Sequence, residues 1–364
     1  MVSHVFLTNA VDQGFTSHSC GKCCEAPWRV RLSRERGRRI RSLRAFQKLK
    51  ERGYQPLPIY GQEHRLGHFA NGSCMFYEDH GCAVHREDGF HAKPTVCQLY
   101  PLSLVNTPDG YFISLSFSCP SVVQGGGEPL RQQIESIDRT LQESKLFQQA
   151  PLPADTRIRL SGCRQISWSD YLSLEPRLLA KLQGESPTRN SLELVAGLID
   201  LSLNANSHWN PTDWSFRTYE RVLDIYPYLT AAVISLLECK DEPAKAEGFC
   251  HRLLEGVTQT SHLLGVELPE LEFKRLDDPG AREVRGRFLE NFVKGKRLLQ
   301  DGTVLTRLLA LACSLSIQNF YFRMDGQLEW SFDLIERHLL GHNDNLMSLF
   351  KDFENRLLLP EHTQ

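Results

Sequence analysis

The sequence predicts an α+β protein, mostly α, with a small irregular cysteine-rich domain packed on a C-terminal all-helical domain. Three observations support this fold class. Seven of the eleven cysteines lie in the first third of the 364 residues. The residues before about 127 are rich in Cys, His, Gly and Pro, whereas those after about 160 are rich in Leu at helical spacing. The length suffices for two domains of ordinary size.

We place the domain boundary near residue 150, giving a cysteine-cluster domain over residues 1–150 and a helical domain over residues 151–364. Two prolines in Gln148–Asp155 discourage a continuous helix across this point. In the first domain, alternating residues predict a short strand at Trp28–Leu32. Ser33 is placed to cap a following helix whose apolar side includes Ile40.

A hairpin is predicted later in the same domain. The turn residues Pro108-Asp109-Gly110 precede an alternating segment, Tyr111–Phe117, which leads directly into Cys119. Three glycines at 125–127 lack the spacing of a dinucleotide-binding loop, and we interpret them as a flexible joint. A helix is expected to follow them, from about Pro129 to Phe147.

The second domain is expected to contain helices only. Apolar residues recur there at helical spacing, as in the stripe that includes Leu305, Leu309 and Ala312. The predicted helices are Ser169–Gln183, Ser191–Leu203, Ser215–Glu238, Pro243–Leu264, Ala281–Leu299, Thr303–Tyr321, Leu328–Leu340 and Asn345–Leu358.

The charge and hydropathy pattern limits the environment of the protein. The formal net charge of −2 gives no overall attraction to nucleic acid or to an anionic membrane, so we do not expect either as a partner. The apolar stretch Leu308–Phe322 is too short and too polar to cross a bilayer. The N-terminus has no secretory pattern, which predicts a cytoplasmic location. The many cations of Arg29–Arg52 form either a basic binding face or a solvated helix, and the net charge favours the second.

The N-terminal cysteines have the spacing of metal ligands rather than of disulfides. A reducing cytosol favours free thiols, and soft thiolates bind zinc, iron or iron–sulfur clusters. Adjacent Cys23 and Cys24 cannot readily bond to each other, because their Cα atoms lie too close. Four cysteines would complete one tetrahedral zinc site or one four-iron cluster, so seven leave some for a second centre or another role. The candidate ligands are Cys20, Cys23, Cys24, Cys74, Cys82, Cys97 and Cys119.

Other residues are weaker candidates. Among the four histidines near the cysteines, His85 is the best placed to ligate a metal, because Cys82-x2-His85 has ligand spacing. Tyr77, Tyr100 and Asp79 are candidate proton acceptors, although packing around the site explains them more simply. We expect the remaining cysteines, which are scattered over the helical part, to be buried packing residues; these are Cys163, Cys239, Cys250 and Cys313.

Three segments resemble the cysteine-cluster family known by its CxxCxxCC pattern, which is described as zinc- or iron-chelating. They are Phe15–Cys24, Cys74–His85 with its Cys-x7-Cys pair, and Lys93–Leu102 with Pro-x2-Cys-x2-Tyr-Pro. Within that family, Ser114–Pro120 is similar to a segment of the flagellin lysine N-methylases, and the helical second half fits their layout. The family's first cysteine falls on Ser17 here, and a serine hydroxyl is a poor ligand for soft metals.

This resemblance implies a metal-binding protein with an iron–sulfur cluster, of the four-iron type, or zinc. It further implies a protein-lysine N-methyltransferase that uses S-adenosylmethionine and acts on a protein substrate bearing lysine. Two other functions stay open from the residues themselves. The cluster is either a structural metal site beside a partner-binding helical domain, or an iron–sulfur redox module.

Overall fold

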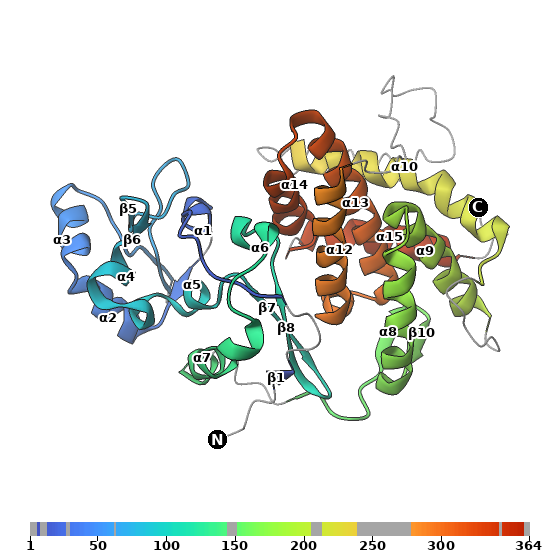
Figure 1. Ribbon diagram of the computed structural model, residues 1–364, viewed down its shortest axis with the longest axis horizontal. Coiled ribbons are helices and arrows are strands. Elements are labelled where there is room, and N and C mark those ends of the chain that lie inside the picture. Colours follow the sequence, from blue (N-terminus) through green and yellow to red (C-terminus); the bar gives the residue numbers. More distant parts are fainter. Residues whose placement is uncertain are drawn as a thin grey trace. The chain divides into compact units, whose positions relative to one another are not determined.

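The computed structural model describes residues 6–7, 13–26, 30–61, 63–143, 151–204, 213–238, 278–341 and 344–359. The chain forms two compact units (Figure 1). The first, here called the cysteine unit, comprises residues 1–8, 12–103 and 119–150. The second, the helical unit, comprises residues 9–11, 104–118 and 151–364, so that the hairpin segment 104–118 belongs with the C-terminal helices. The predicted class, α+β and mostly α, is confirmed.

The cysteine unit consists of short elements separated by tight turns (Figure 1). Its small sheet has the strand order β2-β4-β3, and β5 pairs with β6 in an antiparallel hairpin. The elements are β1 (Phe6–Leu7), α1 (Lys22–Glu25), β2 (Arg31–Leu32), α2 (Arg34–Arg41), α3 (Arg44–Glu51), β3 (Ile59–Tyr60), β4 (Glu63–Arg65), β5 (Tyr77–Glu78), β6 (Gly81–Cys82), α4 (Ala83–Asp88), η1 (Phe90–Ala92), α5 (Thr95–Leu99), α6 (Pro120–Gln124) and α7 (Leu130–Glu143).

The predicted N-cap of α2 is confirmed. The Ser33 hydroxyl accepts a hydrogen bond from the backbone N–H of Arg36 at 3.2 Å, which satisfies one of the free amides of the first turn. The helix does not run on as one rod, because Leu43 is extended and starts α3 instead. Both Ile40 and Leu43 are buried, whereas Arg34 and Arg38 are exposed, so α2 lies at the surface with these two cations in solvent.

The triple glycine is a packed turn rather than the flexible joint we predicted. Gly125, Gly126 and Gly127 all have positive φ, and a Cβ on Gly127 would lie only 2.5 Å from the backbone nitrogen of Thr16. Only glycine permits this approach. The neighbouring Phe15 N–H donates to the Glu128 carbonyl at 2.9 Å. The turn therefore fixes the segment before the first cysteines against the start of α7.

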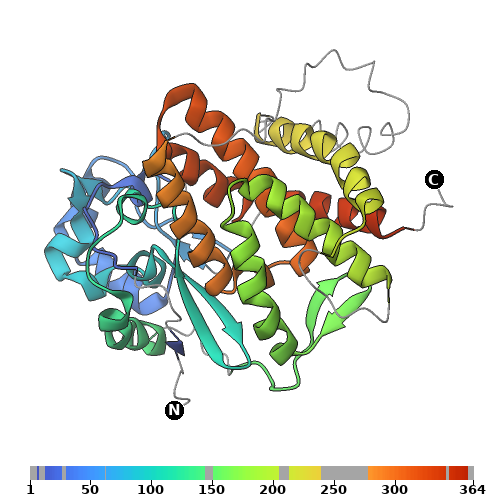
Figure 2. The ribbon, with the colours of Figure 1, turned by 45° about the vertical axis from the view of Figure 1, so that its right-hand side comes forward.

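The helical unit contains two β-hairpins as well as helices (Figure 2). Its elements are β7 (Leu102–Thr107), β8 (Gly110–Leu115), β9 (Ile158–Ser161), β10 (Arg164–Ile166), α8 (Trp168–Leu182), α9 (Pro187–Leu203), α10 (Phe216–Glu238), α12 (Pro279–Lys294), η3 (Arg297–Leu299), α13 (Val304–Asp325), α14 (Leu328–Leu334), a π-helical turn η4 (Ile335–Leu339) and α15 (Asp344–Leu358). The β9–β10 hairpin contradicts the expectation of helices only. The predicted helix Pro243–Leu264 lies outside the described residues.

The centre of the helical unit is a continuous aliphatic and aromatic core around α9 and α13. Leu308, Leu311 and Leu315 of α13 are fully buried, whereas Tyr321 and Phe322 near its end are half-buried. No helix among the described residues has the length and apolar character required to cross a bilayer.

Buried ion pairs are set into this core. The ammonium of Lys296 donates to both carboxylate oxygens of Glu175, at 2.5 and 2.6 Å, and lies 4.4 Å from the ring centre of Phe112. Arg297 pairs with Glu336 at 2.5 Å, with both side chains almost fully buried. Removing one partner of such a pair leaves a charge without compensation in a low-dielectric interior.

Candidate metal centre

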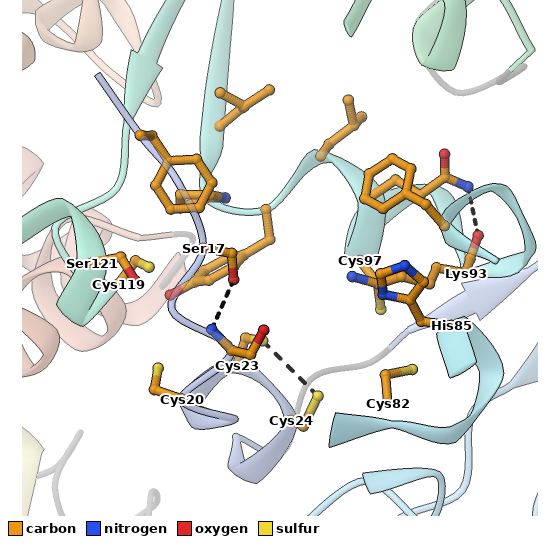
Figure 3. Close-up of a pocket in the computed structure, with 18 of the residues that line it drawn as sticks. Ser17, Cys20, Cys23, Cys24, Cys82, His85, Lys93, Cys97, Cys119 and Ser121 are labelled. Carbon is orange, nitrogen blue, oxygen red and sulfur yellow. Dashed lines mark hydrogen bonds between the residues drawn. The ribbon is translucent and has the colours of Figure 1, made fainter. Parts of the chain in front are cut away.

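A cavity of about 440 Å³ in the cysteine unit is lined by six of the seven candidate cysteines (Figure 3). They are Cys20, Cys23, Cys24, Cys82, Cys97 and Cys119. The seventh, Cys74, is 8% exposed and belongs to the small apolar core of the unit. Cys24, Cys82 and Cys97 pack against this core. Thiols from five separate segments of the chain therefore surround one region.

Gly21 positions the first cysteines, and the close approach of Tyr77 leaves no room there for a larger residue. Gly21 has a φ of 76°, and a Cβ there would lie 1.9 Å from the phenol oxygen of Tyr77. The chain turns at this point into α1, where the N–H of Cys24 donates to the Gly21 carbonyl at 2.7 Å. The Tyr77 ring thus packs against the loop that carries Cys20, Cys23 and Cys24.

Backbone hydrogen bonds join the first and second cysteine segments. The N–H of Cys74 donates to the Cys24 carbonyl at 2.6 Å, which holds residues fifty positions apart side by side. Tyr77 on β5 pairs directly with Cys82 on β6, so the hairpin returns Cys82 toward Cys74. The N–H of Tyr77 donates to the Cys74 carbonyl at 3.0 Å. Burial raises the pKa of Cys74, and the backbone groups of Phe76 and Tyr77 oppose this rise, which favours the thiolate form that binds metal.

The third segment is fixed from behind. Cys97 lies on α5, and the neighbouring Gln98 side chain donates to the carbonyls of His91 and Lys93 at 3.2 and 2.7 Å. Arg36 of α2 also donates to both of these carbonyls. The loop before α5 therefore has little freedom, and Lys93 and Cys97 both face the cavity (Figure 3).

Five cysteines are close enough for their charges to interact. Burial raises the pKa of Cys97, and the neighbouring thiolates of Cys74, Cys82 and Cys23 raise it further. Burial likewise raises the pKa of Cys74 to about 12, with contributions from Cys82 and Cys23. Cys24 experiences the same neighbours. In the absence of a bound cation, these thiols disfavour one another's ionisation, and a metal ion would relieve that repulsion.

Within the adjacent pair, one sulfur is the better ligand. The Sγ atoms of Cys23 and Cys24 lie 3.9 Å apart, at hydrogen-bonding rather than bonding distance. The hydrogen bond from Cys24, helped by the Lys93 ammonium and opposed by burial, lowers the pKa of Cys23 to about 7. The same hydrogen bond, with burial, raises the pKa of Cys24. Of the two thiols, Cys23 therefore ionises more readily than Cys24.

Cys20 and Cys119 form a separate pair at the other side of the cavity (Figure 3). Burial and, to a smaller extent, Cys20 raise the pKa of Cys119, while Val122 and Ser121 oppose this rise. The N–H of Val122 donates to the Cys119 carbonyl at 2.9 Å. Ser17 lies on the same side, and its hydroxyl accepts from the Ser19 N–H at 3.2 Å. With serine at this position, the side has two thiols, which is too few for a tetrahedral all-sulfur site.

Some of the weaker candidates line the cavity and others do not. His85 lines the cavity, where desolvation and the Lys93 charge lower its pKa and keep the ring neutral, as a metal ligand requires. Tyr77 and Tyr100 also line it. His80 and Asp79 do not; both have positive φ in the turn between β5 and β6.

The cysteines outside the cluster meet our expectation only in part. Cys313 is fully buried beside Thr230, and burial raises its pKa to about 12. Cys163 is exposed in the turn between β9 and β10, so the prediction of a buried packing residue is wrong there. That prediction relied on a helix in place of the hairpin. Cys239 and Cys250 lie outside the described residues.

Sequence reasoning missed two parts of the cavity wall. Lys93 stands four residues before Cys97 within the motif, yet nothing in a single sequence indicates that its ammonium would face several thiols. Helix α7 forms a polar wall with Gln132, Gln133 and Ser136. Its contribution depends on the packed glycine turn, which we had predicted to be a joint.

The donor set fits a soft metal. Thiols predominate, and the carboxylate Glu128 is the one acidic side chain among the residues lining the cavity. Within the described ranges, no three histidine, cysteine or acidic side chains converge tightly enough to hold an ion as they stand. Binding therefore requires the thiols to rotate toward a common centre.

The comparison with protein families agrees with this geometry. Residues 16–120 match the model of the CxxCxxCC family, whose description reads "Putative zinc- or iron-chelating domain". No curated protein and no solved structure matches the chain. The matched segment contains all seven cysteines and ends one residue after Cys119. Residues 16–120 of this chain are therefore similar to a family described as zinc- or iron-chelating.

Proposed function

We propose that the cysteine unit binds one metal centre through Cys23, Cys74, Cys82 and Cys97. The observation that carries this proposal is the convergence of these thiols. Cys23, Cys82 and Cys97 line one cavity, and Cys74 belongs to the apolar core against which Cys82 and Cys97 pack. They come from three distant segments, and four thiolates complete either a tetrahedral zinc site or an iron–sulfur cluster. Cys24 is the hydrogen-bond donor to Cys23 rather than a fifth ligand.

Between the two metals, the arrangement favours an iron–sulfur cluster, of the four-iron type. A structural zinc site is closed by its four ligands, whereas here three of the four proposed ligands, Cys23, Cys82 and Cys97, border a cavity of about 440 Å³. A polynuclear cluster spans a wider ligand set than one ion does, and its cysteines bind separate irons. Zinc is the alternative, and it would act mainly by stabilising the fold of the cysteine unit.

The test is an analysis of metal and acid-labile sulfide in anaerobically purified full-length protein, together with its ultraviolet–visible spectrum. We expect a brown protein with iron and sulfide in equal amounts. Loss of both in the Cys97→Ser variant, but not in Cys163→Ser, would assign the centre to these thiols. A colourless protein with one zinc would replace the cluster by a structural site, and a protein that takes up neither metal would refute the proposal.

The open cavity beside the thiols also favours a catalytic role over a purely structural one. Its volume lies in the range of small-molecule sites, and both aromatic and polar groups line it, including Phe15, Phe90 and Gln133. We propose that the enzyme is a protein-lysine N-methyltransferase using S-adenosylmethionine. The support for this activity is the resemblance of Ser114–Pro120 to the lysine methylases, together with the cavity.

Lysine methylation requires a neutral amine, so the site must accept a proton from the substrate ammonium and desolvate its nitrogen. The neutral ring of His85 lines the cavity and has a free nitrogen lone pair that can accept this proton. The test incubates metal-loaded protein with S-adenosylmethionine and a panel of lysine-containing proteins and peptides, followed by mass spectrometry of lysine. Methyl incorporation that disappears in Cys97→Ser supports the activity. A metal-loaded protein that neither binds S-adenosylmethionine nor transfers its methyl group eliminates it.

A further inference from the structure

We propose that Lys93 is the positioning residue that compensates the negative charge of the thiolate centre and thereby sets its metal affinity. This inference rests on the proposed function, because it concerns the same four cysteines. The family match does not assign a role to any lysine. The argument starts from where the ammonium lies and from what holds it there.

Lys93 is anchored through its backbone while its side chain faces the cavity. Its carbonyl accepts hydrogen bonds from Arg36 and from Gln98, the second at 2.7 Å. Its Nζ lies 5.3 Å from the ring centre of Phe90, a cation–π contact that holds the half-buried chain at the cavity wall. The residue is followed by Pro94, which limits the backbone further.

The ammonium faces thiols from two different segments. Lys93 lines the cavity together with Cys23 of α1, Cys97 of α5 and His85 of α4. In agreement with this placement, the Lys93 charge contributes to lowering the pKa of Cys23. Figure 3 shows Lys93, Cys97 and His85 on the same side of the cavity. Among the described residues, no carboxylate forms an ion pair with this ammonium, so its charge is available to the sulfurs.

Four thiolates around a divalent ion carry two net negative charges, and a nearby cation stabilises that state in a partly desolvated cavity. Groups that surround the ligands of a metal site commonly change its affinity by 10- to 100-fold. We therefore assign to Lys93 an effect near the lower end of that range, because one charge is removed and no ligand is lost.

The chain provides a matched control in Lys22. It also lines the cavity and is adjacent in sequence to Cys23. However, the cation that lowers the pKa of Cys23 is Lys93. Replacing each lysine by Met removes one positive charge from the same cavity and preserves most of the side-chain volume.

The experiment titrates metal-free full-length protein with Co²⁺, whose thiolate charge-transfer absorption reports binding. We expect Lys93→Met to raise the dissociation constant about tenfold, Lys93→Arg to restore most of the affinity, and Lys22→Met to leave it near the wild-type value. Circular dichroism of the metal-free variants checks that each has folded.

The outcomes separate this inference from the proposed function. If the wild type binds Co²⁺ through thiolates and Lys93→Met binds equally well, the role of Lys93 is refuted and the metal centre stands. If Lys22→Met weakens metal binding as much as Lys93→Met, the total positive charge of the cavity sets the affinity and Lys93 has no specific role. If Lys93→Arg fails to restore affinity although it is folded, packing rather than charge explains the effect. A wild type that binds no metal refutes both proposals.

Discussion

The cysteine unit and the helical unit are stabilised by different means. The helical unit encloses long helices around side chains such as Leu308, Phe288 and Phe292, all fully buried. The cysteine unit has no helix among its described residues longer than α7, its strands are two or three residues long, and its apolar core includes Cys74 itself. The helical unit can obtain its stability from buried apolar area, whereas the core of the cysteine unit consists partly of thiols.

The proposed metal centre would stabilise the cysteine unit alone. The described elements of this unit are short, and a bound metal contributes folding free energy where such elements bury little apolar surface. Buried thiols with raised pKa values add no ionic stabilisation of their own. Once they share a cation, the same residues hold α1, the β5–β6 hairpin and α5 together.

The largest expected effect comes from removing the metal. Chelation should unfold the cysteine unit and leave the helical unit intact, because structural metal sites supply about 10 kcal/mol or more of folding free energy. Hydrogen exchange followed by mass spectrometry should show rapid exchange in peptides around Cys24, Cys74 and Cys97, with unchanged protection across α9 and α13. Equal loss of protection in both units would show that they do not differ in this way.

The next largest effect is expected from a substitution that destabilises the helical unit and leaves the cysteine unit unchanged. Lys296→Met leaves Glu175 buried without its partner and should destabilise this unit by about 3–5 kcal/mol. Lys294→Met is the control, since its pair with Glu290 is partly exposed and should contribute at most about 1 kcal/mol. Chemical denaturation measures both, and metal content should be unchanged in each variant. If Lys296→Met leaves the free energy of unfolding unchanged, the buried ion pair contributes nothing to the stability of this unit.

A smaller effect tests the division among the cysteines. Cys97→Ser should weaken metal binding by roughly 100-fold or more, since an all-sulfur site loses a ligand. Cys20→Ser should change it by less than about threefold, because Cys20 groups with Cys119 rather than with the four proposed ligands. Competition with a chromophoric chelator measures the two affinities. Equal losses would merge the two groups into one site.

The most gradual effect is the pH dependence of the metal-free cysteine unit. Burial raises the pKa of Cys74 from its ordinary value of 9.0 to about 12. An acid whose pKa is higher in the folded state stabilises the fold below pH 9, and this contribution is lost as the pH rises from about 9 to about 12. Denaturation of metal-free protein at a series of alkaline pH values should show the loss. Metal-loaded protein should lack it, since its thiols are already ionised, and Cys74→Ser should reduce it.

The sequence predicted most elements of the helical unit because their signals are local. The ends of α8, α10 and α15 lie within a residue or two of the prediction, since apolar spacing and caps such as Ser167 act over a few residues. The β9–β10 hairpin escaped because its strands are four and three residues long, which is too short for periodicity to distinguish.

The candidate site was predictable in composition but not in arrangement. Spacing identified the seven cysteines as a cluster, because short Cys-x2-Cys turns carry that information along the chain. Their division into two groups depends on the backbone hydrogen bond between Cys74 and Cys24. The proposed role of Lys93 depends on the fixed loop before α5. Contacts between residues so far apart follow from tertiary packing, which a single sequence does not specify.

X-ray absorption of the loaded protein tests the central claim most directly, since it reports which atoms surround the metal. We predict a first shell of sulfur only, at about 2.3 Å, in the wild type and in Cys20→Ser, and the loss of this metal–sulfur shell in Cys97→Ser. A wild-type shell of nitrogen and oxygen, or a sulfur shell unchanged in Cys97→Ser, would contradict the account.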